Sequence, residues 1–299
     1  MCATLCNHIK AIRGRVLTTA KTTILENIGG LIIDMDGVLW HGKKPLPGLE
    51  AFFALLREKH LPFVLATNNA SLTQQQYIEK LADMGITVSH EEILTSSMAT
   101  ATYLRENLPA DKKRIFVIGE DGLRKPLEAE GFVLTDLYQV NQPAKGITDE
   151  GADIVVSGLD RTLTWDKLAT ATLNIRAGAL FYATNADTTL PTELGEVIGN
   201  GGTLAALQAA TGVEPVCIGK PEPILYQQAL KKLGTDLSNT VAIGDRLNTD
   251  ILGAVNAGIR SIMVLTGVSS REDLQHIDYQ PTWVLDDLEA VTEALKQAL

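Results

Sequence analysis

Short apolar segments alternate with longer amphipathic segments along most of the chain. The apolar segments predict strands at Leu31–Ile33, Phe63–Ala66, Ile115–Ile118, Asp153–Val156, Leu180–Ala183, Val216–Ile218, Val241–Ile243 and Ser261–Leu265. Amphipathic stretches of about 10–15 residues separate them, which is typical of βα units. The pattern therefore predicts an α/β fold with a mostly parallel sheet.

Two of the amphipathic segments carry clear helix boundaries. We expect Ser71 to cap one helix, with Gln74 completing a capping box and Gly85 ending the helix. The apolar stripe of this helix is Tyr77, Ile78, Leu81 and Met84. A second helix is expected to run from Pro223 to Gly234, since proline favours the first helical position and glycine the C-terminal end.

Length and composition limit the possible functions. The chain has 299 residues, of which 45% are hydrophobic, and this is enough for about two domains with buried cores. The 26 basic and 36 acidic residues give a net charge of −10. Because this charge repels nucleic acid and anionic membranes, neither is expected as a partner, and a ligand with a phosphate group would need a local cation.

Cysteine usage and the N-terminal segment bear on the compartment. Cys2, Cys6 and Cys217 fit neither a disulfide framework nor paired zinc-ligand spacing, so a reducing, cytoplasmic location is expected. No apolar run is long enough for a membrane helix. Residues 1–29 are expected to be a disordered leader or an over-long start. Their basic, threonine-rich composition also fits an organellar targeting segment, which is the less favoured alternative.

The sharpest candidate chemistry lies at the end of the first predicted strand. Leu31–Ile33 runs directly into Asp34 and Asp36, and Gly37 follows, where the backbone can turn away. In a parallel α/β sheet, ligands bind at the carboxyl ends of strands, so these acids stand where a site is expected. Taken alone, the pair is equally compatible with a solvated Asp-Gly turn.

Two further acids follow another predicted strand. Val241–Ile243 leads into Asp245, and Asp250 comes at a predicted helix start, where both could simply serve as cap and dipole partners. If this strand neighbours the one that ends at Asp34, the acids would crowd together. Like charges about 4 Å apart repel by roughly 4 kcal/mol at an effective dielectric constant of about 20. A divalent cation would remove this repulsion, and the all-oxygen ligand set favours Mg²⁺ over zinc.

Candidate phosphate ligands follow two more predicted strands. Thr67, Asn68 and Asn69 offer a hydroxyl and two amides that suit phosphate oxygens, although a simple polar turn explains them equally well. Lys220 follows Gly219 after another apolar strand. An isolated lysine is usually a solvated surface charge, whereas one among converging strand ends can hold a phosphate.

Together these residues resemble the four motifs of the haloacid dehalogenase superfamily of phosphatases. In chain order the motifs are Asp34-x-Asp36-Gly-Val, Thr67, Lys220-Pro221 and Gly244-Asp245-x-x-x-x-Asp250. The strings Ala-Thr-Asn-Asn-Ala, Ile-Gly-Lys-Pro and Val-Leu-Thr-Gly-Val are similar to the NagD-type subfamily. That subfamily includes p-nitrophenyl phosphatases and the phosphoglycolate and pyridoxal phosphate phosphatases.

The resemblance implies a mechanism. Asp34 would be the nucleophile that forms an aspartyl-phosphate, and Asp36 would be the general acid/base. The Asp34 carboxylate, the Asp36 backbone carbonyl and Asp245 would hold Mg²⁺, with Asp250 supporting them. The residues expected to bind the phosphate oxygens are Thr67, Asn68, Asn69 and Lys220.

The spacing of the motifs predicts the domain organisation. The segment between Asp34 and Thr67 has room for only one βα unit, whereas the segment between Thr67 and Lys220 is far longer and contains predicted strands of its own. A second domain is therefore expected as an insertion between the second and third motifs. We expect a Rossmann-like core with a parallel sheet at 30–109 and 214–299, and an α/β cap at 110–213.

The cap is expected to select the substrate. Tyr182–Pro191 resembles the family's cap loop over the active site, and Asn185, Asp187 and Leu190 are the candidate leaving-group contacts, although a polar turn explains this segment equally well. The pyridoxal phosphate branch has a histidine at the position of Leu190, which disfavours that substrate. The glycine-rich stretch Gly199–Thr203 lacks the strand and the spacing of a dinucleotide site and is predicted to be a helix start.

The function implied is Mg²⁺-dependent hydrolysis of small phosphorylated metabolites. The candidate esters are nucleoside monophosphates, sugar phosphates, phosphoglycolate and p-nitrophenyl phosphate. A phosphotransferase or phosphomutase on the same core is the alternative, and a non-catalytic phosphate-binding protein is less favoured because Asp34, Asp36 and Asp245 are all present. A homodimer is compatible with a cap of this size.

Overall fold

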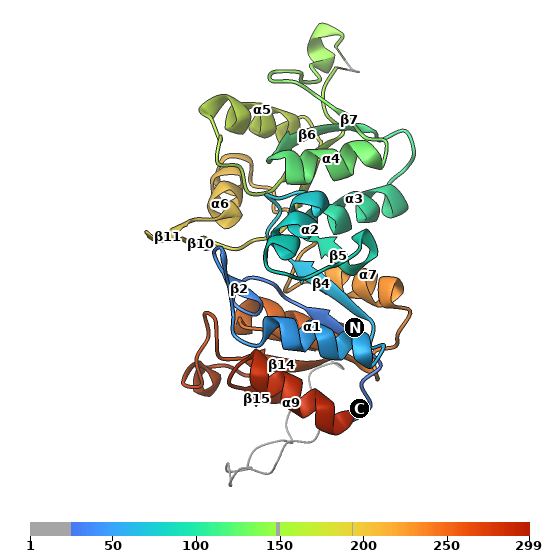
Figure 1. Cartoon of the computed structure of the whole chain (residues 1–299). Coiled ribbons are helices and arrows are strands. Elements are labelled where there is room, and N and C mark those ends of the chain that lie inside the picture. The colour runs from blue at the N-terminus through green and yellow to red at the C-terminus, as the bar shows by residue number, and fades with distance from the viewer. Residues whose placement is uncertain (1–24, 148–149, 193) are drawn as a thin grey trace, which may run out of the picture.

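Two parallel sheets flanked by helices form two lobes, stacked along the long axis of the molecule (Figure 1). The computed structural model describes residues 25–147, 150–192 and 194–299. We call the lobe that holds both ends of the described chain the core and the other lobe the cap. Within the described ranges, no helix is both long and apolar enough to cross a membrane.

The core is built on a six-stranded sheet in the order β15-β14-β13-β1-β4-β5, in which every neighbouring pair is parallel. Its strands are β1 (Gly30–Ile33), β4 (Phe63–Thr67), β5 (Ile93–Thr95), β13 (Thr240–Gly244), β14 (Arg260–Val264) and β15 (Trp283–Leu285). Strands β1 and β13 are direct neighbours, with Ile33 paired to Ile243. The carboxyl ends of the two acid-bearing strands therefore lie side by side.

Helices cover both faces of the core sheet. They are α1 (Leu49–Glu58), α2 (Gln74–Asp83), α3 (Ser96–Asn107), α7 (Pro223–Leu233), α8 (Leu252–Ala257) and α9 (Leu288–Ala298). Successive side chains of a strand point to opposite faces, so Leu31 and Ile33 pack with α1 and α9, whereas Ile32 packs with α7 and α8. This two-sided burial explains why the strands appear in the sequence as continuous apolar runs.

The cap has a five-stranded parallel sheet in the order β12-β9-β8-β6-β7. Its strands are β6 (Arg114–Ile118), β7 (Val133–Leu134), β8 (Ile154–Ser157), β9 (Leu180–Ala183) and β12 (Val216–Cys217), and its helices are α4 (Asp121–Ala129), α5 (Trp165–Arg176) and α6 (Asn200–Thr211). Helices α5 and α6 pack on one face, and α4 packs on the other, where it also contacts α3 of the core. The two lobes thus share one hydrophobic cluster across α3 and α4.

Short elements complete the fold. Two antiparallel hairpins are formed by β2 (Trp40–His41) with β3 (Lys44–Pro45), and by β10 (Thr189–Thr192) with β11 (Gly195–Ile198). Single 3₁₀ turns occur at His90–Glu92, Pro143–Lys145 and Asp273–His276, and a π-helical turn at Leu247–Ile251 leads into α8.

The α/β class and the inserted cap are confirmed. Only the β2–β3 hairpin and α1 lie between β1 and β4, as the motif spacing predicted. Strand β12 pairs with β9, Val216 opposite Tyr182, so the cap sheet takes in residues beyond 213. At the other end, residues 25–29, which were counted with the leader, pack on the core: Leu25 is buried and the Gly29 N–H donates to the Asn239 carbonyl.

Several local predictions need correction. Helix α2 is capped by Thr73, not Ser71, because Thr73 and Gln76 form a reciprocal capping box while the Ser71 hydroxyl donates to Asn69 Oδ1. Gly85, with φ of 81°, ends the helix as predicted. Leu190 lies in strand β10 and not in a loop, because residues 189–192 pair with β11.

Other local predictions hold. Helix α7 starts at Pro223 and ends at Gly234, and α6 starts directly after Gly199. Cys217 is a free thiol, and burial raises its pKa to about 11. Cys2 and Cys6 lie outside the described residues.

Candidate active site

Three buried acids meet at the carboxyl edge of the core sheet. Asp34 follows β1, and its backbone N–H still donates to the Ile243 carbonyl, 2.8 Å away. Asp245 follows β13, and Asp250 lies in the π-helical turn after it. One oxygen from each carboxylate lies within 4.8 Å of the others. The sequence predicted such crowding for four acids; the structure brings these three together, and Asp36 is not among them.

Lys220 neutralises part of this charge. Its Nζ lies 2.5 Å from Asp34 Oδ1 and 2.6 Å from Asp250 Oδ1, and it also donates to the Ala66 carbonyl at 3.0 Å. Burial opposes the charge of Lys220, but the two carboxylates outweigh it and hold the pKa of Lys220 above its usual value. Burial also raises the pKa of Asp34, although Lys220 acts in the opposite direction.

Asp245 is left with an unsatisfied oxygen. Its Oδ2 accepts from the Val268 N–H at 2.8 Å, but Oδ1 is buried with no hydrogen-bond partner among the described residues. Burial, with the nearby charge of Asp250, raises the pKa of Asp245 to about 7. A buried carboxylate oxygen without a donor is costly, so the position suits a cation.

The surroundings of Asp245 leave no room for side chains. A Cβ on Gly37 would lie 2.5 Å from Asp245 Oδ2, and a Cβ on Gly267 would lie 1.8 Å from it. Gly37 also has a φ of 87°, which other residues rarely adopt. By contrast, both oxygens of Asp250 are engaged, one by Lys220 and one by the Arg246 N–H. The free acceptors for an oxygen-preferring cation are therefore on Asp34 and Asp245.

Asp36 stands apart from the buried cluster. It is only partly buried, and its Oδ1 accepts a hydrogen bond from Trp40 Nε1 at 2.7 Å. Thr266 Oγ1 donates to the carbonyl of Gly37, the next residue, at 2.7 Å. No role was predicted for Trp40 or Thr266, although Thr266 lies in the Val-Leu-Thr-Gly-Val string. The place of Thr266 just after the end of β14 is a signal that could have found it, whereas Trp40 looks in the sequence like an ordinary core residue.

The residues after β4 divide into different roles. Thr67 is buried and its Oγ1 accepts from the Asn69 N–H at 3.0 Å. Asn68 joins Lys220 through two hydrogen bonds, one in each direction, both 2.8 Å long. The Asn69 side chain instead accepts from the N–H and hydroxyl of Ser71 and so shapes the turn. Of the three, Asn68 is the one bonded to Lys220, and Thr67 follows Ala66, whose carbonyl accepts from Lys220 Nζ.

Comparison with known proteins decides the family. Residues 31–133 match the haloacid dehalogenase-like hydrolases, and residues 217–291 match a second HAD-hydrolase-like family. An acid sugar phosphatase of Staphylococcus saprophyticus is 36% identical over 91% of this chain and 100% of its own length. A 5′-nucleotidase of Bacillus subtilis is 38% identical over 88% of this chain and 97% of its own.

The fold agrees. The crystal structure of a glycerol phosphate phosphatase from Mycobacterium tuberculosis, in complex with magnesium, matches with a TM-score of 0.77 and 36% identity, over 89% of this chain and 76% of that one. This chain belongs to the haloacid dehalogenase-like hydrolases. Within that family it is a phosphoric monoester hydrolase of the NagD-like group.

The cap of this HAD-like hydrolase reaches the acid cluster through one loop. Asp187, which follows β9, accepts a hydrogen bond from the Asn68 amide at 3.0 Å and another from Asn185. Asn200, at the start of α6, donates to the Asn185 carbonyl at 2.7 Å and so holds this loop. Asp187 therefore contacts the core directly, whereas Asn185 supports it from within the cap.

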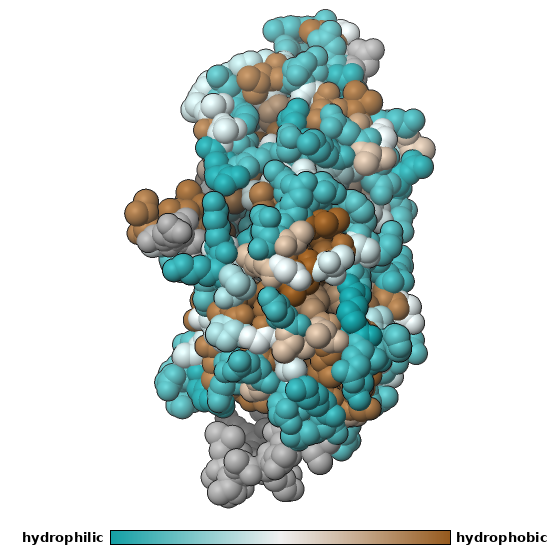
Figure 2. Space-filling view, in the orientation of Figure 1, coloured by the Kyte–Doolittle hydropathy of each residue, from teal (hydrophilic) through white to brown (hydrophobic). Residues whose placement is uncertain are grey.

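Leu190 lies further along, in the β10–β11 hairpin. It is partly buried and pairs with Val197 of β11. The hairpin exposes apolar side chains at its turn, where Leu194 is 99% exposed, and at its base, where Ile198 is 71% exposed. Figure 2 shows a hydrophobic projection at the left edge of the molecule, where Figure 1 places this hairpin. Leu190 thus lies between the cap loop and the exposed turn of the hairpin.

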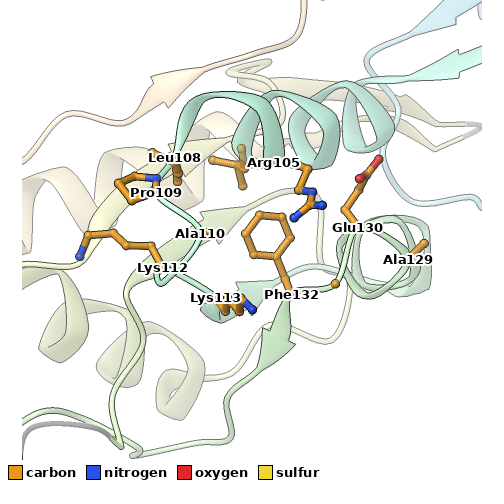
Figure 3. Close-up of a pocket in the computed structure, with 11 residues that line it drawn as sticks. Arg105, Leu108, Pro109, Ala110, Lys112, Lys113, Ala129, Glu130 and Phe132 are labelled. Carbon is orange, nitrogen blue, oxygen red and sulfur yellow. The ribbon is translucent and has the colours of Figure 1, made fainter.

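Two cavities lie outside the acid cluster. One of about 590 Å³ lies between the lobes and is lined by Ser71 and Gln76 of the core and by Arg124, Arg161 and Lys167 of the cap. The other, of about 330 Å³, lies between the end of α3 and the start of β6 (Figure 3). Lysines and an arginine surround this smaller cavity at the C-terminal ends of α3 and α4, where cations are favoured by the helix dipoles.

Proposed function

We propose that this HAD-like hydrolase cleaves small phosphate monoesters with the help of Mg²⁺, through an aspartyl-phosphate on Asp34. The observation that carries the proposal is the pairing of Asp34 with Lys220 beside the unpartnered Oδ1 of Asp245. The Asp34 carboxylate, the buried Lys220 ammonium group and a carboxylate oxygen without a donor thus lie at one edge of the sheet. Such a combination has no structural need in a parallel sheet, but it suits a phosphate dianion.

The residues fit a divalent cation with oxygen ligands. Asp34 and Asp245 have free carboxylate oxygens, and the Asp36 backbone carbonyl is the third proposed ligand, while Asp250 is committed to Lys220 and Arg246. When bound, Mg²⁺ would neutralise charge on the phosphate and on the carboxylates together.

The chain's own groups account for the two chemical steps. An oxygen of Asp34 attacks phosphorus, a new O–P bond forms, and the bond to the leaving oxygen breaks. Lys220, Thr67 and Asn68 are the residues that would bind the non-bridging oxygens and hold the phosphoryl group in line. Water then attacks the aspartyl-phosphate and regenerates Asp34.

Asp36 is proposed to move the protons. It gives a proton to the leaving oxygen in the first step and takes one from the attacking water in the second. Its partial burial and its place outside the acid cluster fit this role, because a group held between Lys220 and other acids could not exchange protons as freely.

The cap loop is proposed to choose the leaving group. Asp187 contacts Asn68 of the core beside Lys220, Asn185 donates to Asp187, and Leu190 follows on the hairpin. The relatives are named as acid sugar phosphatase, 5′-nucleotidase and glycerol phosphate phosphatase. We therefore propose sugar phosphates, nucleoside monophosphates and polyol phosphates as the substrate classes, with p-nitrophenyl phosphate as a convenient reporter.

Phosphate release from a panel of phosphorylated metabolites tests the proposal. Activity should require Mg²⁺, disappear in excess EDTA and return when Mg²⁺ is restored. Full turnover in EDTA would refute the metal requirement. Adding glycerol or ethanol as competing acceptors separates hydrolysis from transfer: a hydrolase releases inorganic phosphate, whereas a phosphotransferase would convert the acceptor to a new ester.

A further inference from the structure

The only hydrogen bond recorded for the Asp36 side chain among the described residues comes from a tryptophan. Trp40 is fully buried, and its Nε1 lies 2.7 Å from Asp36 Oδ1. A tight turn brings the two together. The Gly37 N–H donates to the Trp40 carbonyl at 2.9 Å, and the Leu39 N–H donates to the Met35 carbonyl at 2.8 Å. The indole is therefore aimed at Asp36 by the backbone itself.

Residues from the C-terminal part of the chain hold this turn in place. Thr266 Oγ1 donates to the Gly37 carbonyl, and Asp245 fills the space where a side chain at Gly37 would be. The positive φ of Gly37 is required for this reversal. Moving Trp40 away from Asp36 would therefore disturb the contacts around Asp245 as well.

A lysine covers the face of the same indole. Lys80, from α2, places its Nζ 4.0 Å from the centroid of the Trp40 ring, which is cation–π geometry. Lys80 is partly buried; burial lowers its pKa, and the negative charge of Asp36 acts in the opposite direction. Trp40 is thus held on its edge by Asp36 and on its face by Lys80.

The chemistry of the indole decides what this contact does. An indole N–H can only donate a hydrogen bond, so Asp36 Oδ1 must remain an acceptor whether or not the carboxyl group is protonated. Because a carbonyl oxygen accepts a hydrogen bond better than a carboxyl hydroxyl oxygen, this contact favours Oδ2 as the oxygen that carries and transfers the proton. We propose that Trp40 is a positioning residue that fixes the orientation of the Asp36 carboxyl group by engaging Oδ1 and leaving Oδ2 for the reaction, and that Lys80 holds the indole in place. This inference rests on the proposed acid/base role of Asp36.

The proposed role of Trp40 matters most for esters whose leaving group must be protonated. In the first step, the proton on Asp36 Oδ2 passes to the leaving alkoxide as its bond to phosphorus breaks. A nitrophenolate leaves readily without that proton, whereas an alkyl alkoxide does not. Loss of the indole N–H should therefore slow the cleavage of alkyl phosphates far more than the cleavage of p-nitrophenyl phosphate.

Trp40→Phe tests this, because it keeps an aromatic ring and removes the donor. The measurement is kcat/KM, which reports formation of the aspartyl-phosphate, for glycerol phosphate and for p-nitrophenyl phosphate with Mg²⁺ present. We expect the ratio of the two values to fall by about tenfold or more, since misplacing a catalytic group by about 1 Å can cost about 10²-fold. The matched control is Trp283→Phe on β15, where Arg260 lies over the ring at 5.4 Å and the ratio should not change.

A second variant covers the case in which Trp40→Phe does not fold. Lys80→Met removes the charge over the ring and keeps the aliphatic stem in a partly exposed position. It should shift the ratio in the same direction by a smaller factor. Binding of orthovanadate, which needs the phosphate ligands but no proton transfer, should be unchanged in both variants.

Asp36→Asn separates this inference from the proposed function. If Asp36→Asn lowers the ratio and Trp40→Phe does not, Asp36 is the acid and the positioning role is refuted. If Asp36→Asn leaves both values unchanged, the acid assignment itself is wrong. Equal losses on both esters in Trp40→Phe would also overturn the inference, because they would indicate a general disturbance of the site.

Discussion

The Asn68 amide of the core lies 3.0 Å from the Asp187 carboxylate of the cap and donates a hydrogen bond to it. The same amide nitrogen donates to the Lys220 carbonyl at 2.8 Å, and Asn68 Oδ1 accepts from the Lys220 N–H. One core side chain therefore touches both the lysine that neutralises Asp34 and the cap loop. This connection ties the position of the cap to the site where the phosphate is expected to bind.

Removing the cap side of this contact should change substrate preference. In Asp187→Ala we expect kcat/KM to change unequally among sugar phosphates and nucleoside monophosphates, with smaller changes for p-nitrophenyl phosphate and for Mg²⁺ affinity. Asp166→Ala is the control, because Asp166 is an exposed cap acid bonded to the Tyr138 hydroxyl. A uniform change over all esters would show that this loop does not select the leaving group.

The hairpin position of Leu190 allows a gain-of-function test. Leu190→His restores the residue expected in the pyridoxal phosphate branch, so activity on pyridoxal phosphate should rise relative to nucleotides. Val197→His is the control, since Val197 pairs with Leu190 on the neighbouring strand of the same hairpin. Initial rates on the two esters measure the effect, and an equal response in the two variants would argue against a specific role for position 190.

Asp34→Asn should abolish phosphate release while leaving the chain folded. An amide matches the carboxylate in size but cannot form the acyl-phosphate. The fold should survive because Lys220 keeps its ion pair with Asp250, and the variant loses one buried carboxylate from a crowded cluster. Phosphate release and the circular dichroism melt are the two measurements. Wild-type turnover in this variant would refute Asp34 as the nucleophile.

Mg²⁺ should stabilise the protein through Asp245. A cation that binds only the folded chain raises its stability by about 2.7 kcal/mol at a concentration about 100 times Kd. The thermal midpoint should therefore rise with Mg²⁺ in the wild type and much less in Asp245→Asn. Asp286→Asn removes an exposed acid paired with Arg271 and should respond like the wild type. An undiminished response in Asp245→Asn would exclude Asp245 as a ligand.

Loss of Lys220 should destabilise the fold. Lys220→Met leaves Asp34 and Asp250 buried without their shared partner, and breaking a buried pair from one side costs about 3–5 kcal/mol. Lys231→Met breaks only an exposed pair with Glu106 and should cost less than about 1 kcal/mol. Urea unfolding in EDTA measures both free energies. Similar values for the two variants would mean that the buried pair adds no stability.

Local sequence determined the elements and the residues at their ends. Buried parallel strands are apolar on both faces, so β1 and β13 stand out as short apolar runs, and the acids that follow them fall at the edge where such sheets bind ligands. The inserted cap was also predictable from the sequence, because the segment between Thr67 and Lys220 is longer than one βαβ crossover connection. These are properties of neighbouring residues and of chain length.

Tertiary structure decided which of these residues touch. Ser71 and Thr73 are both residue types that cap helices. Thr73 caps α2 because the Ser71 hydroxyl donates to Asn69 in the turn after β4. Asn68 forms hydrogen bonds with Asp187 and Lys220, which lie 119 and 152 residues further along the chain. In the sequence, Trp40 resembles an ordinary core residue. Only the turn at Gly37, which is held by Thr266, brings the indole N–H of Trp40 to Asp36. Such contacts depend on how distant strands pair, and no local pattern of residues contains that information.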